Sequence, residues 1–119
     1  MLNFKFLKSA KIRKRSEYQP VFKANKRLYS RFFTLYYRLN SLDTGRLGVV
    51  VGKAHARLSV SRNRIKRIVR EEFRLSQHEL KGIDIVLVAK KSVSEDLNNE
   101  LRPCLIELLK QLRTQVKKS

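Results

Sequence analysis

The chain has 119 residues, enough for one domain with a hydrophobic core and too few for two ordinary domains. Its 28 Lys and Arg against 10 Asp and Glu give a formal net charge of +18, while 42% hydrophobic residues exclude wholesale disorder. No apolar run approaches the roughly 20 residues of a membrane span. We therefore expect a polyanionic ligand, with nucleic acid favoured over an anionic membrane surface.

The basic residues are concentrated at the start of the chain. Residues 1–40 hold eleven Lys or Arg and one acid, whereas residues 81–119 hold eight against five. The arm 1–15 and the tail 116–119 are expected to be flexible. No signal segment opens the sequence, and Cys104 has no disulfide or metal-site companion, so a cytoplasmic location is expected.

A short helix with an aromatic face is predicted near Ser16, because Tyr18, Val21 and Phe22 fall on one side of it. Pro20 lacks a backbone N–H and is tolerated only in the first turn of a helix. A helix start later than Ser16 therefore stays open.

Residues 31–40 alternate as a half-buried strand does. One face is predicted to carry Phe33, Leu35, Tyr37 and Leu39, and the other Phe32, Thr34, Tyr36 and Arg38. Residues 46–53 predict a second strand, and the short link favours an antiparallel hairpin of the two. The face with Tyr36 mixes rings and charge, the combination that a platform for single-stranded nucleic acid needs.

The run 83–89 is nearly all apolar, which predicts a central strand covered on both faces. Asp84 within it is expected to face the sheet edge, and roles in binding a cation or capping a turn stay open. Amphipathic helices are predicted over 57–77 and 94–117, with Pro103 splitting the second. The chain, residues 1–119, is thus predicted to be one α+β domain: a two-layer α/β sandwich with helices packed on a small mixed sheet.

The central helix has two contrasting faces. Its core stripe, within roughly 140° of arc, comprises Leu58, Ile65, Ile68, Val69 and Phe73. The other face carries Arg62, Asn63, Lys66, Arg67, Arg70 and Arg74. Ordinary solvated faces interleave charges of both signs, yet no acid occurs here before Glu71. Because guanidinium groups match phosphate oxygens, this face is predicted to contact nucleic acid, with RNA favoured.

The run Arg62-Asn63-Arg64-Ile65-Lys66-Arg67, followed by Arg70 and Phe73, resembles the signature helix of the bacterial ribonuclease P protein subunit. The resemblance covers nearly the whole chain, through the basic arm, Tyr18 and Phe22, Arg31, Gly48 and Lys53, and Ala89-Lys90-Lys91. It implies a fold like that of a ribosomal-protein domain. The signature helix would lie in a left-handed crossover, against the usual right-handed rule.

The resemblance also implies a function. The chain would be the accessory subunit of an endoribonuclease whose catalytic centre lies in an RNA. That RNA uses Mg²⁺ to remove the 5′ leader of precursor tRNA, and the protein binds both the RNA and the leader. The protein would bind no metal tightly and would act as a monomer within a 1:1 ribonucleoprotein.

The residues that the resemblance assigns form two groups. Those expected to contact the catalytic RNA are Lys53, Arg62, Asn63, Arg64, Lys66, Arg67 and Arg70. Those expected to line the leader cleft are Tyr18, Phe22, Arg31, Tyr36, Arg38 and Lys90. Ala54 stands where the family usually has a second lysine, so the contact of that lysine is left unassigned.

Catalysis by the chain itself is not indicated. His55 and His78 are 23 residues apart and lack metal-ligand companions. The pairs Glu71-Glu72 and Glu95-Asp96 point about 100° apart on a helix and suit surface or cap roles. Three alternatives stay open: a ribosomal or assembly protein, a protein-only nuclease, and a reader of double-stranded DNA.

Overall fold

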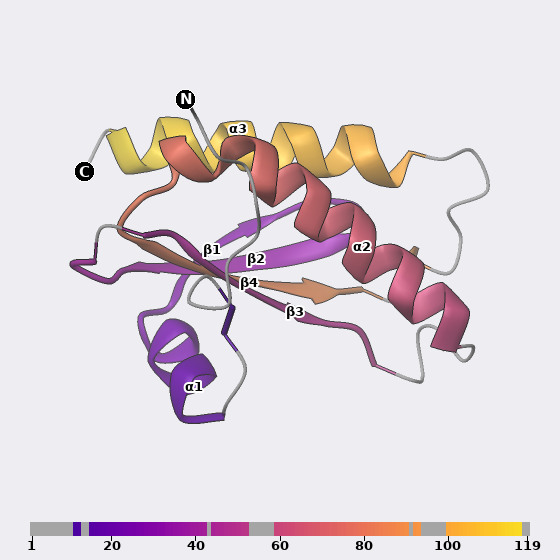
Figure 1. Ribbon diagram of the computed structural model, residues 1–119, viewed down its shortest axis with the longest axis horizontal. Helices are drawn as coiled ribbons and strands as arrows, with labels where there is room; N and C mark the ends of the chain where they lie inside the picture. Colours follow the sequence, from indigo (N-terminus) through magenta and orange to yellow (C-terminus); the bar gives the residue numbers. More distant parts are fainter. Residues whose placement is uncertain are drawn as a thin grey trace.

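The computed structural model describes residues 11–12, 15–42, 44–52, 59–90, 92–93 and 100–117. The helices are α1 (Arg15–Lys23), α2 (Ser59–Ser76) and α3 (Leu101–Lys117), with a 3-10 turn at Gln77–Glu79; the strands are β1 (Lys26–Tyr29), β2 (Phe33–Leu39), β3 (Arg46–Val50) and β4 (Ile83–Ala89). Helices α2 and α3 cover one face of the sheet, and α1 lies against the other (Figure 1). The predicted α+β fold with one small mixed sheet is confirmed.

Strand β4 lies at the centre of the sheet, as its apolar sequence predicts. The order is β1-β2-β4-β3, with β4 antiparallel to β2 and parallel to β3. The predicted hairpin of β2 and β3 is therefore wrong. β4 separates these strands because it is apolar on both faces and is buried along nearly its whole length. The hairpin that does form joins β2 to β1, a strand of four residues that is too short for its alternation to be recognised.

The connection from β3 through α2 to β4 joins two neighbouring parallel strands. It is left-handed, as Figure 1 shows, and so departs from the rule that such crossovers are right-handed. The crossover places α2 over β3, with its outer face turned to solvent.

The main core fills the space between the sheet and the helices α2 and α3. Four predicted residues of α2 lie in it, namely Ile65, Ile68, Val69 and Phe73, as do Phe33, Leu35 and Tyr37 of β2. Phe32 belongs to the same core, so its predicted place on the opposite face is wrong. Pairing of β2 with β4 begins only at Phe33, and the alternation of a strand does not apply to the residue before it.

The two prolines sit differently in their helices. Helix α1 begins at Arg15, which excludes a later start, and Pro20 lies within it, where it removes one helical hydrogen bond. Pro103 stands in the first turn of α3, where the missing N–H is tolerated, and it does not interrupt the helix. The predicted helical residues 57–58 and 94–99 lie outside the described residues, as do 118–119 of the tail.

Two glutamates at the end of α2 meet α3. Glu71 accepts a hydrogen bond of 2.8 Å from Arg102, which lowers the pKa of the Glu71 carboxyl. Glu72 is 7% exposed, and its Oε2 lies 3.5 Å from Arg102 Nη1. A surface role for Glu72 is therefore wrong, because α3 covers that side of α2.

Asp84 is fully buried in the central strand, so the prediction that it faces the sheet edge is also wrong. Arg46 donates to both carboxylate oxygens, from Nε at 2.8 Å and from Nη2 at 2.7 Å. Asn40 donates a third bond of 2.7 Å, and Arg38 lies 3.4 Å away. The carboxylate thus ties the neighbouring strands β2 and β3 to β4.

The same pair reaches helix α1. Arg46 Nη1 lies 3.3 Å from the carboxylate of Glu17, near the start of that helix. Burial alone would raise the pKa of Asp84, but the hydrogen bonds from Arg46 and Asn40 and the charges of Arg46 and Arg38 outweigh it and hold this pKa below its usual value. Asp84 therefore stays ionised inside the protein.

We expect Asp84→Asn to lower the free energy of unfolding by about 3 kcal/mol at pH 7, because the change leaves the guanidinium of Arg46 without a buried counter-charge. The pKa of Asp84 is lower in the folded state than its usual unfolded value of about 3.9. Its contribution is therefore complete above that value and is lost as the pH falls through the folded-state pKa. Urea denaturation over a pH series measures both effects.

The matched control is Glu100→Gln, which breaks the solvent-exposed pair of Glu100 with Arg31. That change should cost less than about 1 kcal/mol. A cost for Asp84→Asn as small as that of the control, or an undiminished loss of stability in acid for the Asn variant, would contradict the role given to the buried pair.

Candidate nucleic-acid interface

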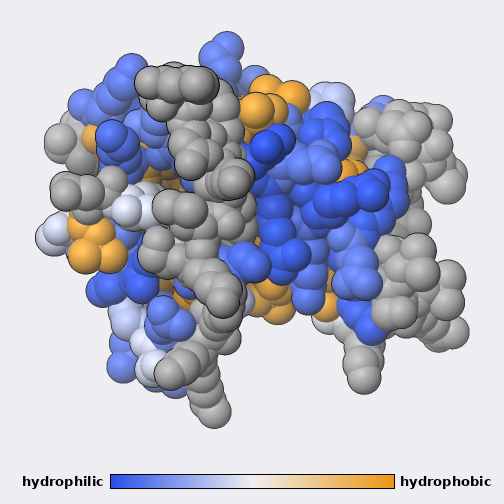
Figure 2. Space-filling model, in the orientation of Figure 1, coloured by the Kyte–Doolittle hydropathy of each residue, from blue (hydrophilic) through white to orange (hydrophobic). Residues whose placement is uncertain are grey.

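The outer face of α2 presents a row of basic side chains. Burial of its core stripe turns the opposite side to solvent, and Figure 2 shows that the surface over α2 is mostly hydrophilic. The residues of this basic face are Arg62, Asn63, Arg64, Lys66, Arg67 and Arg70, all exposed or half-buried. The structure thus brings together six of the seven residues predicted to contact the catalytic RNA. Lys53, the seventh, lies outside the described residues.

The basic face ends at an acid of its own helix, Glu71. Arg67 Nε lies 3.9 Å from Glu71 Oε1, and the Arg67 side chain is 71% exposed. So long and exposed a pair contributes little. The shorter bond of Glu71 goes to Arg102 on α3, so the positive charge of the basic face is not cancelled by its own helix.

Three rings gather on the other face of the sheet and form an aromatic cluster: Tyr18 and Phe22 of α1 and Tyr36 of β2. Tyr18 and Phe22 are stacked with their centroids 6.3 Å apart, and Phe22 meets Tyr36 edge-on at 4.8 Å. The guanidinium of Arg27 lies 5.7 Å from the Tyr36 centroid, which adds a cation to the cluster. All three rings were predicted to line a leader cleft, and the structure brings them together.

Gly48 allows the aromatic cluster to sit close to the sheet. A Cβ at this position would lie 2.7 Å from the ring of Tyr18, a distance that real Cβ atoms do not show. Beneath the cluster, Val21 of α1 packs with Ile12 and with Val86 of β4. A small second core therefore holds α1 and its rings against the strands.

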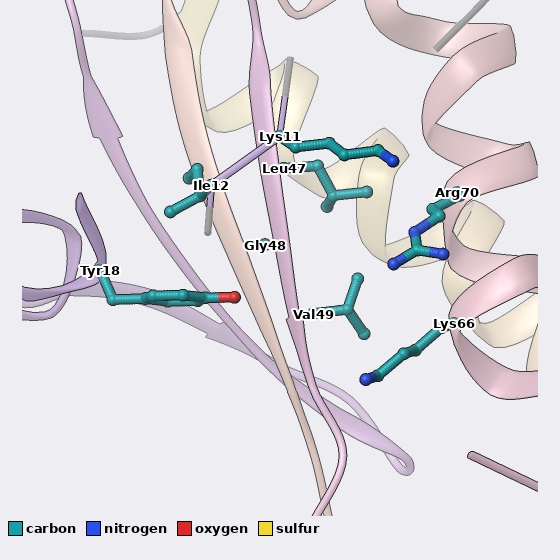
Figure 3. Close-up of a pocket in the computed structure, with 8 residues that line it drawn as sticks. All are labelled: Lys11, Ile12, Tyr18, Leu47, Gly48, Val49, Lys66 and Arg70. Carbon is teal, nitrogen blue, oxygen red and sulfur yellow. The ribbon is translucent and has the colours of Figure 1, made fainter. Parts of the chain in front are cut away.

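The basic face and the aromatic cluster meet at the outer edge of β3, where Lys11 bridges to Leu47 and Ile12 N–H donates a bond of 2.9 Å to the Leu47 carbonyl. A cavity of about 290 Å³ lies there between Tyr18 and the α2 side chains Lys66 and Arg70. Figure 3 shows Lys66 and Arg70 reaching from α2 towards β3, with Tyr18 on the far side of Gly48. Burial raises the pKa of Tyr18, as does the charge of Glu17, while Arg70 lowers it, so Arg70 acts electrostatically on this ring. The two surfaces are continuous around one strand.

Three residues predicted for the leader cleft lie away from the aromatic cluster. Arg38 is next to the buried Asp84. Arg31 bonds to Glu100 and lies 4.9 Å from the Phe32 ring, whereas Lys90 donates a bond of 2.6 Å to the carbonyl of Ser30. Arg31 and Lys90 lie where β2 begins and β4 ends, so the predicted set is spread along the sheet.

Sequence reasoning missed two cations of this face. Arg46, expected only as the start of a strand, connects Asp84 to α1 and so positions the aromatic cluster. A lone acid inside an apolar strand is the signal that a buried basic partner exists. Arg27 was missed with β1, whose register places it opposite Tyr36.

Within the part of the chain that the structure describes, no group of three or more His, Cys, Asp or Glu side chains is placed to hold a metal ion. Over the same residues, every helix is too short or too polar to cross a membrane.

Comparisons with known proteins agree on one family. The family model described as Ribonuclease P matches residues 6–113. The ribonuclease P protein component of Coxiella burnetii (strain Dugway 5J108-111) is 42% identical over 92% of this chain and 90% of its own length. That of Pseudoalteromonas translucida (strain TAC 125) is 37% identical over 98% and 84%.

Solved structures agree with the sequence comparisons. The RNase P protein from Thermotoga maritima superposes with a TM-score of 0.74 at 35% identity, covering 85% of this chain and 96% of its own. The Staphylococcus aureus RNase P protein gives a TM-score of 0.80 at 28% identity, covering 88% and 96%.

Proposed function

Because the chain belongs to the ribonuclease P protein family and is thus the protein subunit of a tRNA-processing endoribonuclease, we propose that it binds the catalytic RNA through the basic face of α2. The aromatic cluster binds the 5′ leader of precursor tRNA. In this role the chain assists the Mg²⁺-dependent removal of the leader. The observation that carries the proposal is the meeting of these two unlike surfaces at the edge of β3.

The basic face suits a folded RNA. Its side chains stand on a rigid helix and project along one side, so they can meet phosphates whose positions the RNA fold determines. Arg62, Lys66 and Arg70 follow each other at four-residue spacing, about 6 Å apart along the axis at about 1.5 Å per residue. Binding should therefore release counterions and weaken with salt.

The aromatic cluster suits a single strand. Unstacked bases bind aromatic rings with little regard to sequence, and nearby cations meet the phosphates. Phe22 is 38% exposed, and Arg27 supplies a cation next to Tyr36. A leader whose sequence differs from one precursor to the next needs a surface of this tolerant kind.

In the proposed holoenzyme the Mg²⁺ ions and the catalytic centre belong to the RNA. This chain supplies binding energy and position, as one protein on one RNA. Its large positive charge, neutralised by that RNA, fits a ribonucleoprotein subunit that works in the cytoplasm.

We expect Arg67→Ala and Arg70→Ala each to weaken binding of a bacterial ribonuclease P RNA by about 1–3 kcal/mol and to reduce the slope of log affinity against log salt by about one. Titration of labelled RNA at several salt concentrations measures both quantities. The control is Lys110→Ala, which removes the same charge from an exposed position on α3. Unchanged binding for both arginine variants, or an equal loss for the control, would remove the basic face from the RNA contact.

We expect Tyr36→Ala to weaken holoenzyme binding of precursor tRNA by about 1–3 kcal/mol, the worth of one stacked base. Binding of mature tRNA, which has no leader, should be nearly unchanged, and Tyr36→Phe should retain most of the precursor affinity because it keeps the ring. Equilibrium binding to matched precursor and mature tRNA measures the difference. Equal losses on the two tRNAs would refute the assignment of the aromatic cluster to the leader.

A further inference from the structure

Helix α1 leaves part of its sheet face open. The register places Tyr29, Thr34, Val88 and Val50 in one row across the four strands, on the same side as Tyr36. The second core under α1 is centred on Val86, one row away, and Val88 packs against it, so the row is open at its two ends, Tyr29 and Val50. In this row the side chain of Tyr29 is 61% exposed and that of Val50 is 38% exposed, although both are large hydrophobic residues.

Tyr29 carries a cation on one side of its ring. Lys90 Nζ lies 5.5 Å from the ring centroid, and the same ammonium group donates a bond of 2.6 Å to the carbonyl of Ser30, which holds it in place. Next to them Arg31 is 57% exposed. An exposed ring with a fixed ammonium group combines a stacking surface with a phosphate contact.

We propose that Tyr29 and Lys90 form a second nucleotide subsite, in which one base of single-stranded RNA stacks on the open side of Tyr29 and its phosphate meets Lys90. The proposal rests on the proposed function, because the strand that reaches this subsite is the leader held at Tyr36. It also accounts for Lys90, which lies apart from the aromatic cluster.

The distance between the two subsites determines how the strand lies. Tyr29 is opposite Thr34, two residues along β2 from Tyr36, so the two rows are about 6.8 Å apart at about 3.4 Å per residue. Bases stacked in a helical strand are about 3.4 Å apart. A base on Tyr29 and a base on Tyr36 are therefore two such steps apart and do not stack directly on each other.

The test measures affinity of the holoenzyme for precursor tRNAs whose leaders increase one nucleotide at a time from none. Tyr29→Ala should weaken binding about fivefold or more once the leader is long enough to reach the subsite, and should leave mature tRNA unaffected. Tyr29→Phe should bind like the unchanged protein. Lys90→Gln should flatten the salt dependence of the leader-dependent part.

Ile106→Ala is the control, since Ile106 is 50% exposed on α3, on the opposite side of the sheet. It should change neither binding nor the unfolding midpoint, and Tyr29→Ala should leave that midpoint unchanged as well.

If Tyr29→Ala has no effect at any leader length while Tyr36→Ala does, the subsite is refuted and the proposed function stands. If neither variant has a leader-dependent effect, the leader assignment fails as a whole. A loss for Tyr29→Ala that is equal on mature tRNA also refutes the subsite, and an unchanged salt slope removes Lys90 from it.

Discussion

The buried carboxylate of Asp84 is the interaction on which the arrangement of the sheet depends. An ionised group inside a central strand is costly unless strong donors surround it. Here Arg46 and Asn40 donate to both oxygens, from β3 and from the end of β2. The carboxylate can be surrounded in this way because β4 lies between β2 and β3. The contact of Arg46 with Glu17 also orients α1.

That arrangement places two unlike surfaces on either side of one edge strand. The left-handed crossover carries α2 over one face of β3, with its basic side outward, while α1 holds its rings over the other face at Gly48. A net charge of +18 disfavours the compact chain through self-repulsion, and a polyanion relieves it. A bound polyanion would therefore stabilise from outside the fold that the core stabilises from inside. Of the alternatives that composition left open, the family match singles out the ribonuclease P subunit.

How much the sequence could predict depended on the range of the interaction. Periodicity along α2 depends only on neighbouring turns, so the division of Ile65 and Phe73 from Arg62 and Arg70 was predictable. The order of the strands was not, because the short link after β2 favours a hairpin while the apolar β4 competes for the same edge. The partners of Asp84 are separated from it by 38 to 46 positions along the chain. No local sequence pattern identifies partners at such separations.

The candidate site divides in the same way. Tyr18, Phe22 and Tyr36 could be grouped because a helix face and a strand face each follow from spacing, and the family resemblance joined the two. Arg31 and Lys90 could not be placed, since their positions depend on where β2 begins and β4 ends. Tyr29 went unnoticed because its strand has only four residues.

The most direct test of the account is cleavage of a precursor tRNA at moderate Mg²⁺ by the protein alone, by a bacterial ribonuclease P RNA alone, and by the two together. Only the mixture is expected to cleave efficiently at the mature 5′ end. A mixture no faster than the RNA alone, or cleavage by the protein without RNA, would contradict it.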